Sequence, residues 1–61
     1  MTTIPIEDQI AELEREHKVR LRVYPLWVRD GRLSMEESAH RVACMAAAID
    51  TLKATIQPTL L

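Results

Sequence analysis

The 61-residue chain has few of the residues that hold small domains together through disulfides or metals. It contains one cysteine, Cys44, so no disulfide can form within the chain. The chain has one Cys and two His, fewer than the four ligands of a structural zinc site, so we expect neither a metal nor a cofactor. A chain of this size buries only about 60% of its unfolded surface. Self-association is the remaining means of stabilisation, and the sequence predicts a homo-oligomer, a dimer or higher.

Long apolar runs and catalytic motifs are also missing. No apolar run approaches the roughly 18 residues of a membrane span, and the N-terminal residues lack the features of a signal peptide. We therefore expect a cytoplasmic protein with no membrane partner. Without a glycine-rich phosphate loop, a nucleophile elbow or a carboxylate pair across a cleft, the sequence predicts that the protein is not an enzyme.

Charge is distributed unevenly along the chain, although the formal net charge is only −1. Residues 1–14 carry four acidic side chains and no base, whereas residues 15–32 carry six bases and two acids. Proteins that bind nucleic acids in general usually carry a net positive charge. The basic middle segment therefore indicates a small anionic ligand or an acidic patch on a protein, and nucleic acid is not the expected partner.

Apolar residues in the first half of the chain recur in steps of four and three, which is the period of an amphipathic helix. The stripe consists of Ile6, Ile10, Leu13, His17 (counted as amphipathic), Leu21, Tyr24 and Val28. We expect a first helix over about residues 5–29, with Thr3 as its N-cap. Pro25 is expected to kink the helix rather than end it, because Val28 continues the stripe and Gly31 lies where a left-handed C-cap is expected.

A second helix is expected over about residues 34–57, after a turn over residues 30–33. Ser34 and Glu37 form the pattern of a capping box, in which each side chain accepts a hydrogen bond from the amide of the other residue. The apolar period then continues until Pro58. It is carried by Ala39, Val42, Met45, Ala46, Ile49, Leu52 and Ile56.

These elements predict one all-α domain over residues 1–61, a two-helix antiparallel hairpin. A hairpin has a single internal interface, so much of each apolar stripe would remain in contact with water in a monomer. We therefore expect the hairpins to assemble into a homo-oligomeric helical bundle, of which a four-helix dimer is the simplest closed form.

Residues 20–34 have the composition of a binding site, since they hold both aromatic residues and four of the six arginines. Tyr24 and Trp27 can stack on a planar ligand, or they can instead fill the closed end of the hairpin core. The guanidinium groups of arginines bind phosphate well. They can instead pair with carboxylates on the same helix, as Arg20 would with Glu16, and then form an ordinary solvated helix face. The predicted ligand-binding residues are Arg20, Arg22, Tyr24, Trp27 and Arg41.

The remaining reactive side chains are expected to be structural. Cys44 has no base placed to activate it, and we interpret it as a small buried hydrophobic residue. His17 lies on the first apolar stripe, and His40 is expected to be partly exposed. Glu36 is the one carboxylate four residues from His40, and a closed zinc site needs four ligands, so no metal is expected.

The run VYPLWV at residues 23–28 is followed by GRLS at 31–34, by AHR at 39–41 and by Met45. This pattern resembles a group of very small proteins encoded in phages and prophages of proteobacteria, whose pattern is approximately ELERE, then RVYPxWVxxGRL. The resemblance spans roughly residues 11–52. The chain departs from it at Leu26, where the group often has arginine.

The resemblance implies a non-enzymatic protein directed against a host cell, a phage protein of the counter-defence or host-takeover type. One form is a sponge that sequesters a nucleotide signal of antiviral defence, and another is an inhibitor of a host regulator, as a quorum-sensing anti-activator is. Because aromatic residues and arginines cluster, we expect first the capture of an anionic nucleotide second messenger at sites between subunits. The alternative is a protein-binding inhibitor of a host regulatory or defence protein.

Overall fold

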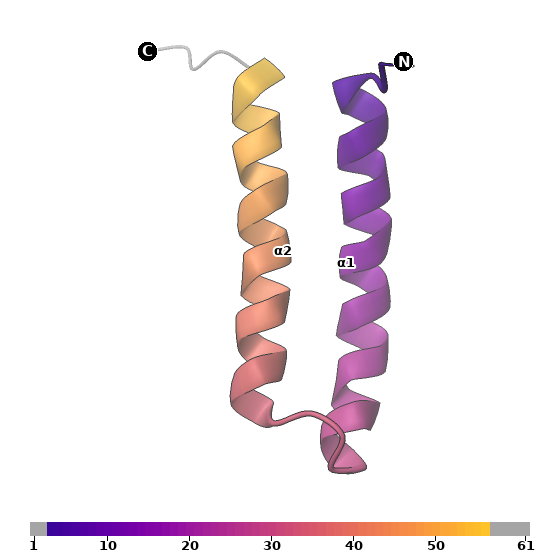
Figure 1. Cartoon of the computed structure of the whole chain (residues 1–61), viewed down its shortest axis with the longest axis vertical. Helices are drawn as coiled ribbons and strands as arrows, with labels where there is room; N and C mark the ends of the chain where they lie inside the picture. Colours follow the sequence, from indigo (N-terminus) through magenta and orange to yellow (C-terminus); the bar gives the residue numbers. More distant parts are fainter. Residues whose placement is uncertain (1–2, 57–61) are drawn as a thin grey trace.

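The computed structural model describes residues 3–56 as two helices joined by a short turn (Figure 1). Helix α1 spans Ile6–Arg29 and helix α2 spans Met35–Ile56. The helices lie side by side and run in opposite directions, so the chain is the all-α hairpin that the sequence predicts. The predicted end of the second helix at residue 57, before Pro58, lies outside the described residues. Over residues 3–56, neither helix is apolar enough along its length to cross a membrane.

Helix α1 begins without a side-chain cap. Pro5 is the N-cap residue, and its carbonyl accepts hydrogen bonds from the amides of Asp8 at 3.1 Å and Gln9 at 3.2 Å. The side chain of Gln9 donates to the carbonyl of Ile4 at 3.0 Å. The prediction that Thr3 caps this helix is therefore wrong. Thr3 lies two residues before the N-cap, and a capping oxygen has to belong to the N-cap residue to reach the free amides of the first turn.

Helix α1 continues through Pro25 and ends in a Schellman motif centred on Gly31. Gly31 has φ +74° and its amide donates to the carbonyl of Val28 at 3.1 Å. The amide of Arg32 donates to the carbonyl of Trp27 at 2.8 Å. These are the two hydrogen bonds that define the motif, and they satisfy carbonyls left free at the helix end. The predicted left-handed glycine is confirmed, and so is the continuation of the helix past the proline.

Helix α2 begins at the predicted cap, Ser34. Its Oγ accepts a hydrogen bond from the amide of Glu37 at 3.0 Å, and its carbonyl accepts one from Ser38 at 2.9 Å. The return bond of the predicted capping box is not formed between these residues. The carboxylate of Glu37 instead lies 3.5 Å from Arg41, one turn further along the helix. The cap therefore stabilises the helix through one hydrogen bond instead of two.

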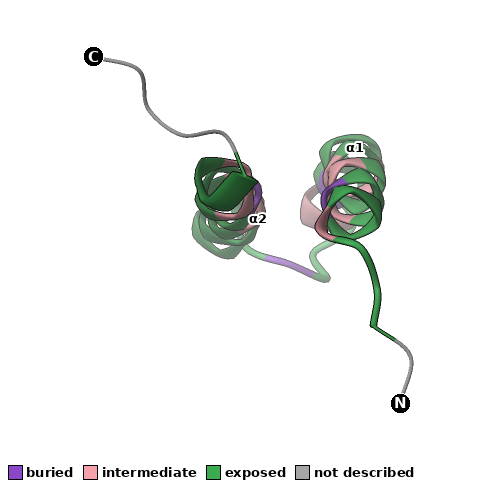
Figure 2. Ribbon diagram, turned by 90° about the horizontal axis from the view of Figure 1, so that it is seen from above, coloured by how far each residue is buried: buried purple, intermediate pink, exposed green. Residues whose placement is uncertain are grey.

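The core between the helices is small, and most of the surface is exposed or half-buried (Figure 2). Four hydrophobic side chains, Ile10, Tyr24, Leu33 and Ile49, are 6–9% exposed. None of the described side chains is fully buried. The Cα radius of gyration is 14.4 Å, compared with about 10.5 Å for a compact domain of this length. The hairpin is therefore an elongated molecule with little interior of its own.

Three residues predicted for the apolar seam lie outside it. Leu21 is 51% exposed, Ile56 is 37% exposed, and Ala39 is exposed. Residues that face a packed neighbouring helix follow a repeat close to seven, because the two helices wrap around each other. Tyr24 follows this seven-residue repeat, whereas Leu21 does not. Leu21 therefore lies at the edge of the interface. Ile56 is at the open end of the hairpin, where the facing helix has ended.

Candidate binding surfaces

Arg20, Tyr24 and Trp27 lie next to one another on α1, as their spacing predicts. The rings of Tyr24 and Trp27 are stacked, with centroids 5.4 Å apart and planes 29° apart. The guanidinium of Arg20 lies 5.8 Å from the centroid of the Tyr24 ring, and that of Arg32 lies 5.4 Å from the Trp27 ring. Each aromatic ring therefore has a cation partner within the chain. We call these four side chains the arginine–aromatic column.

Arg20 connects the two helices. Its Nε donates to the carboxylate of Glu16 at 3.1 Å, which confirms the predicted pair. Its Nη1 donates to the backbone carbonyl of Arg41 on α2 at 3.3 Å. The Arg20 side chain is only 25% exposed. Part of its hydrogen-bonding capacity is therefore used to hold the hairpin together, and the rest faces solvent.

Tyr24 belongs to the core as well as to the column. It is 7% exposed, with Trp27 stacked on it and Arg20 above its ring. A residue that stacks on a ligand has to offer a free ring face. Trp27 is half-buried and keeps more of its surface accessible. In a single hairpin, Trp27 is therefore the better placed of the two aromatic residues for contact with another molecule.

The structure separates the other two predicted ligand-binding arginines from the column. The guanidinium of Arg41 lies 3.5 Å from the carboxylate of Glu37, and its side chain is 51% exposed. Arg22 is exposed and lies two residues from Arg20, which is about 200° around the helix. Only the backbone of Arg41 meets the column, through Arg20, and Arg22 points to a different side of α1.

Arg32 completes the column, although it is not among the residues selected as ligand-binding from the sequence. A Schellman motif brings the residue after the left-handed glycine close to the residue five positions earlier. Here those residues are Arg32 and Trp27, which lie on either side of the turn at Gly31. Once Gly31 is recognised as the left-handed residue, the same rule applied to the sequence would predict this contact.

A second stripe runs along α1 on the side that α2 does not cover. Its members are all exposed and follow the i, i+3, i+4, i+7, i+8, i+11 pattern of one helix face: Lys18, Leu21, Arg22, Pro25, Leu26 and Arg29. Leu21 and Leu26 are 51% and 47% exposed. We call this surface, with three basic and three apolar residues, the outer stripe. This stripe was missed from the sequence because Leu21 was assigned to the seam. The period of one helix face is nevertheless present in the sequence at positions 18, 21, 22, 25, 26 and 29.

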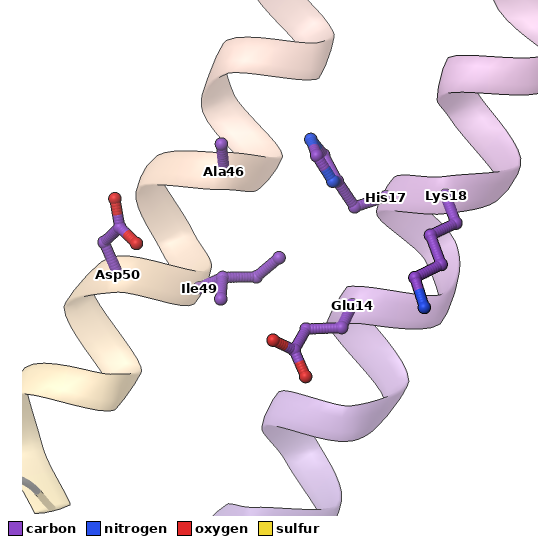
Figure 3. Close-up of a pocket in the computed structure, with 6 residues that line it drawn as sticks. All are labelled: Glu14, His17, Lys18, Ala46, Ile49 and Asp50. Atoms are coloured by element: carbon purple, nitrogen blue, oxygen red, sulfur yellow. The ribbon is translucent and has the colours of Figure 1, made fainter.

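Two hollows open on different faces of the hairpin. One has a volume of about 310 Å³ and is lined by Glu14, His17, Lys18, Ala46, Ile49 and Asp50 (Figure 3). The other, of about 500 Å³, is lined by Ile4, Asp8, Gln9, Glu12, Leu13 and Leu52. Leu13 and Glu14 are consecutive, so their side chains diverge by about 100° around α1. This divergence places the two hollows on different faces.

An ion pair between the helices involves Glu14, one of the residues that line the smaller hollow. Nζ of Lys53 lies 2.9 Å from the carboxylate of Glu14, and both side chains are more than 40% exposed. Figure 3 shows His17 of α1 and Ile49 of α2 both pointing into the space between the helices. Within residues 3–56, no three side chains of the metal-binding types come together. The ion pair between Lys53 and Glu14 fixes one edge of the interface, but at this exposure it contributes only about 0–1 kcal/mol to stability.

Cys44 is exposed, so the prediction that it is a buried hydrophobic residue is wrong. It lies five residues before the buried Ile49, which is about 140° around the helix. This angle places the thiol on the side of α2 that faces away from α1. Its Sγ lies 3.4 Å from Nε2 of His40, one turn earlier on the same exposed side.

Comparison of the chain with protein-family models, with curated proteins and with solved structures found no match. The features that bear on function are the surfaces of the hairpin itself. They are the arginine–aromatic column at the closed end, the outer stripe of α1 and the two hollows.

Proposed function

We propose that this protein is a non-enzymatic inhibitor that binds a host regulatory or defence protein through the outer stripe of α1. The observation that carries the proposal is the exposure of Leu21 and Leu26, at 51% and 47%, beside the exposed Arg22. A helix that binds in a groove is recognised through anchors three, four or seven residues apart, and the stripe offers Leu21 and Pro25 at a spacing of four. Arginine is enriched at protein interfaces. The partner is therefore expected to offer an apolar groove with an acidic rim.

The setting of this function follows from the sequence pattern around VYPLWV. Its resemblance to small phage-encoded proteins supports a host protein as the target and the host cytoplasm as the location. The small core supports assembly into a homo-oligomeric helical bundle, because a bundle buries the half-exposed seam. Each subunit of such an assembly keeps its outer stripe free, and a dimer would present two copies of it.

Capture of an anionic nucleotide signal between subunits is the second candidate function. Its support is the hydrogen bond from the Arg20 side chain of α1 to the backbone carbonyl of Arg41 on α2, which joins two of the predicted ligand-binding residues across the helices. It ranks below protein binding for two reasons. Tyr24 is 7% exposed and already stacked, and the guanidinium of Arg20 already pairs with Glu16.

Affinity capture from host lysate at physiological salt tests the first proposal, with the double variant Leu21→Ser and Leu26→Ser as the probe. Wild type is expected to retain a stoichiometric protein partner, and the double variant to lose it without a change in helicity. Met35→Ser is the matched control, since Met35 is 75% exposed but lies on α2, outside the outer stripe. Equal capture by wild type and the double variant would remove the outer stripe from consideration.

Isothermal titration distinguishes the second candidate. The probes are cyclic dinucleotides and trinucleotides, cyclic ADP-ribose isomers and NAD. Protein binding alone predicts flat titrations. Saturable heat with one of these compounds, lost in Arg41→Ala, would favour nucleotide capture instead.

A further inference from the structure

Folding of the hairpin separates charge toward its two ends. The open end, residues 3–17 with 45–56, carries six acidic and two basic side chains. The closed end, residues 18–44, carries six basic and three acidic side chains. Antiparallel packing of α1 and α2 brings each of these groups together in space (Figure 1). The molecule is therefore acidic at the open end and basic at the turn.

One broad face carries matching features at these two ends. Leu13, Arg20 and Trp27 follow one another at intervals of seven residues on α1, so they share a face of the hairpin. At the closed end this face presents the half-buried Trp27 beside the guanidinium of Arg32. At the open end it presents the hollow of about 500 Å³ that Leu13 lines. We call this surface the tryptophan face.

The hollow has the chemistry that an arginine-flanked indole requires. Its apolar lining comes from Ile4, Leu13 and Leu52, and its acidic groups are Asp8 and Glu12. An indole fits an apolar recess, and an arginine beside it pairs with carboxylates at the rim. The two ends of the tryptophan face are therefore complementary to each other, but they are too far apart to meet within one chain.

We propose that two copies of this chain pair through their tryptophan faces, with their turns at opposite ends. Trp27 of each copy then lies over the open-end hollow of the other, and Arg32 approaches Glu12 of the partner copy. A two-fold axis makes this contact twice. The pairing specifies the self-association proposed above and rests on it. With turns at the same end, like charges would face each other.

The size of the face agrees with a second copy as its occupant. Helix α1 has 24 residues and is therefore about 36 Å long, and two helices side by side are about 20 Å wide. The face thus measures about 700 Å², close to the roughly 800 Å² that each partner contributes to a standard interface. Arg20 lies near the two-fold axis of such a dimer, so the Arg20 side chains of the two copies approach each other. The ion pair with Glu16 in each copy offsets the positive charge of Arg20 there.

A charge-swap experiment tests the pairing by analytical ultracentrifugation at low and physiological salt. Glu12→Lys alone and Arg32→Glu alone each place like charges at both contacts of a homodimer. Each is expected to weaken dimerisation by at least about tenfold. An equimolar mixture of the two variants has opposite charges at both contacts, so it is expected to form a heterodimer about as tight as the wild type. Arg22→Glu, on another side of α1, is the matched control and is expected to leave the dimer unchanged.

Disulfide trapping provides a readout that does not depend on Arg32 tolerating a negative charge. In a Cys44→Ser background, Glu12→Cys and Arg32→Cys lie about 30 Å apart in one chain, so a disulfide between them forms only between copies. The double variant is expected to give a covalent dimer on mild oxidation, and Glu12→Cys alone is expected to stay monomeric on a denaturing gel.

The outcomes separate the proposals. Dimerisation that the charge swaps do not weaken overturns this arrangement but leaves self-association intact. The same conclusion follows if the mixture of variants does not restore dimerisation and Glu12→Cys alone forms a cross-linked dimer. A mass of 7.0 kDa at all concentrations overturns both. Neither result bears on target binding through the outer stripe, which the lysate experiment measures separately.

Discussion

Replacing Gly31 by alanine isolates the backbone contribution of the turn. Gly31 has φ +74°, and a Cβ added there would meet nothing within 4 Å. The substitution therefore creates no clash, and its effect comes from the left-handed conformation, which costs an L-residue about 1–2 kcal/mol. Part of this loss is offset, because alanine restricts the unfolded chain by about 0.4–1 kcal/mol. The expected net loss in the free energy of unfolding is about 1 kcal/mol.

Thermal unfolding followed by circular dichroism measures this loss. For a domain of this size, about 1 kcal/mol corresponds to a fall in Tm of roughly 4–8 °C. Protein concentration has to be held constant, because association contributes to Tm. Gly31→Asn is the matched variant and is expected to lose less, since asparagine tolerates the left-handed region better than alanine. An alanine variant as stable as the wild type, or less damaged than the asparagine variant, would refute the Schellman turn.

Three further substitutions test the capping and the core. Ser34→Ala should lower the free energy of unfolding by about 0.5–2 kcal/mol, because the Oγ bond to the amide of Glu37 is lost, whereas Thr3→Ala should leave the urea midpoint unchanged. Tyr24→Ala should destabilise the fold by about 3–5 kcal/mol, as the removal of a buried aromatic ring does. If Tyr24→Ala instead abolished partner or ligand binding with an unchanged melting curve, the tyrosine would be a contact residue and its burial would be irrelevant.

The elements and their ends could largely be predicted because their signals are local. A left-handed glycine and a serine N-cap act on amides and carbonyls within five residues along the chain, so Gly31 and Ser34 could be placed without knowing how the helices pack. The contacts of Tyr24 with Arg20 and with Trp27 are equally local. The error at Thr3 is also local, because a shift of two residues in the predicted N-cap, from Pro5 to Thr3, decides which side chain is expected to cap the helix.

Burial was harder to predict because it depends on how one helix lies against the other. A straight helical wheel places Leu21 in the seam, but the seven-residue repeat of packed helices moves it to the edge and brings Arg20 toward α2. Cys44 was misplaced because its small, apolar character was taken as evidence of burial, while its angle from Ile49 was not considered. The outer stripe of α1 was missed for the same reason, because Leu21 was assigned to the seam.

The short connection between the helices also has a kinetic consequence. Residues 30–34 join two elements that are neighbours in sequence, so forming the hairpin closes only a small loop. Helical folds with such local contacts form in microseconds to milliseconds. The encounter of two chains is a second-order process, and at low concentration it becomes the slowest step. The rate at which active assemblies accumulate would then rise with the square of the chain concentration, which makes the amount synthesised a determinant of how soon the protein acts.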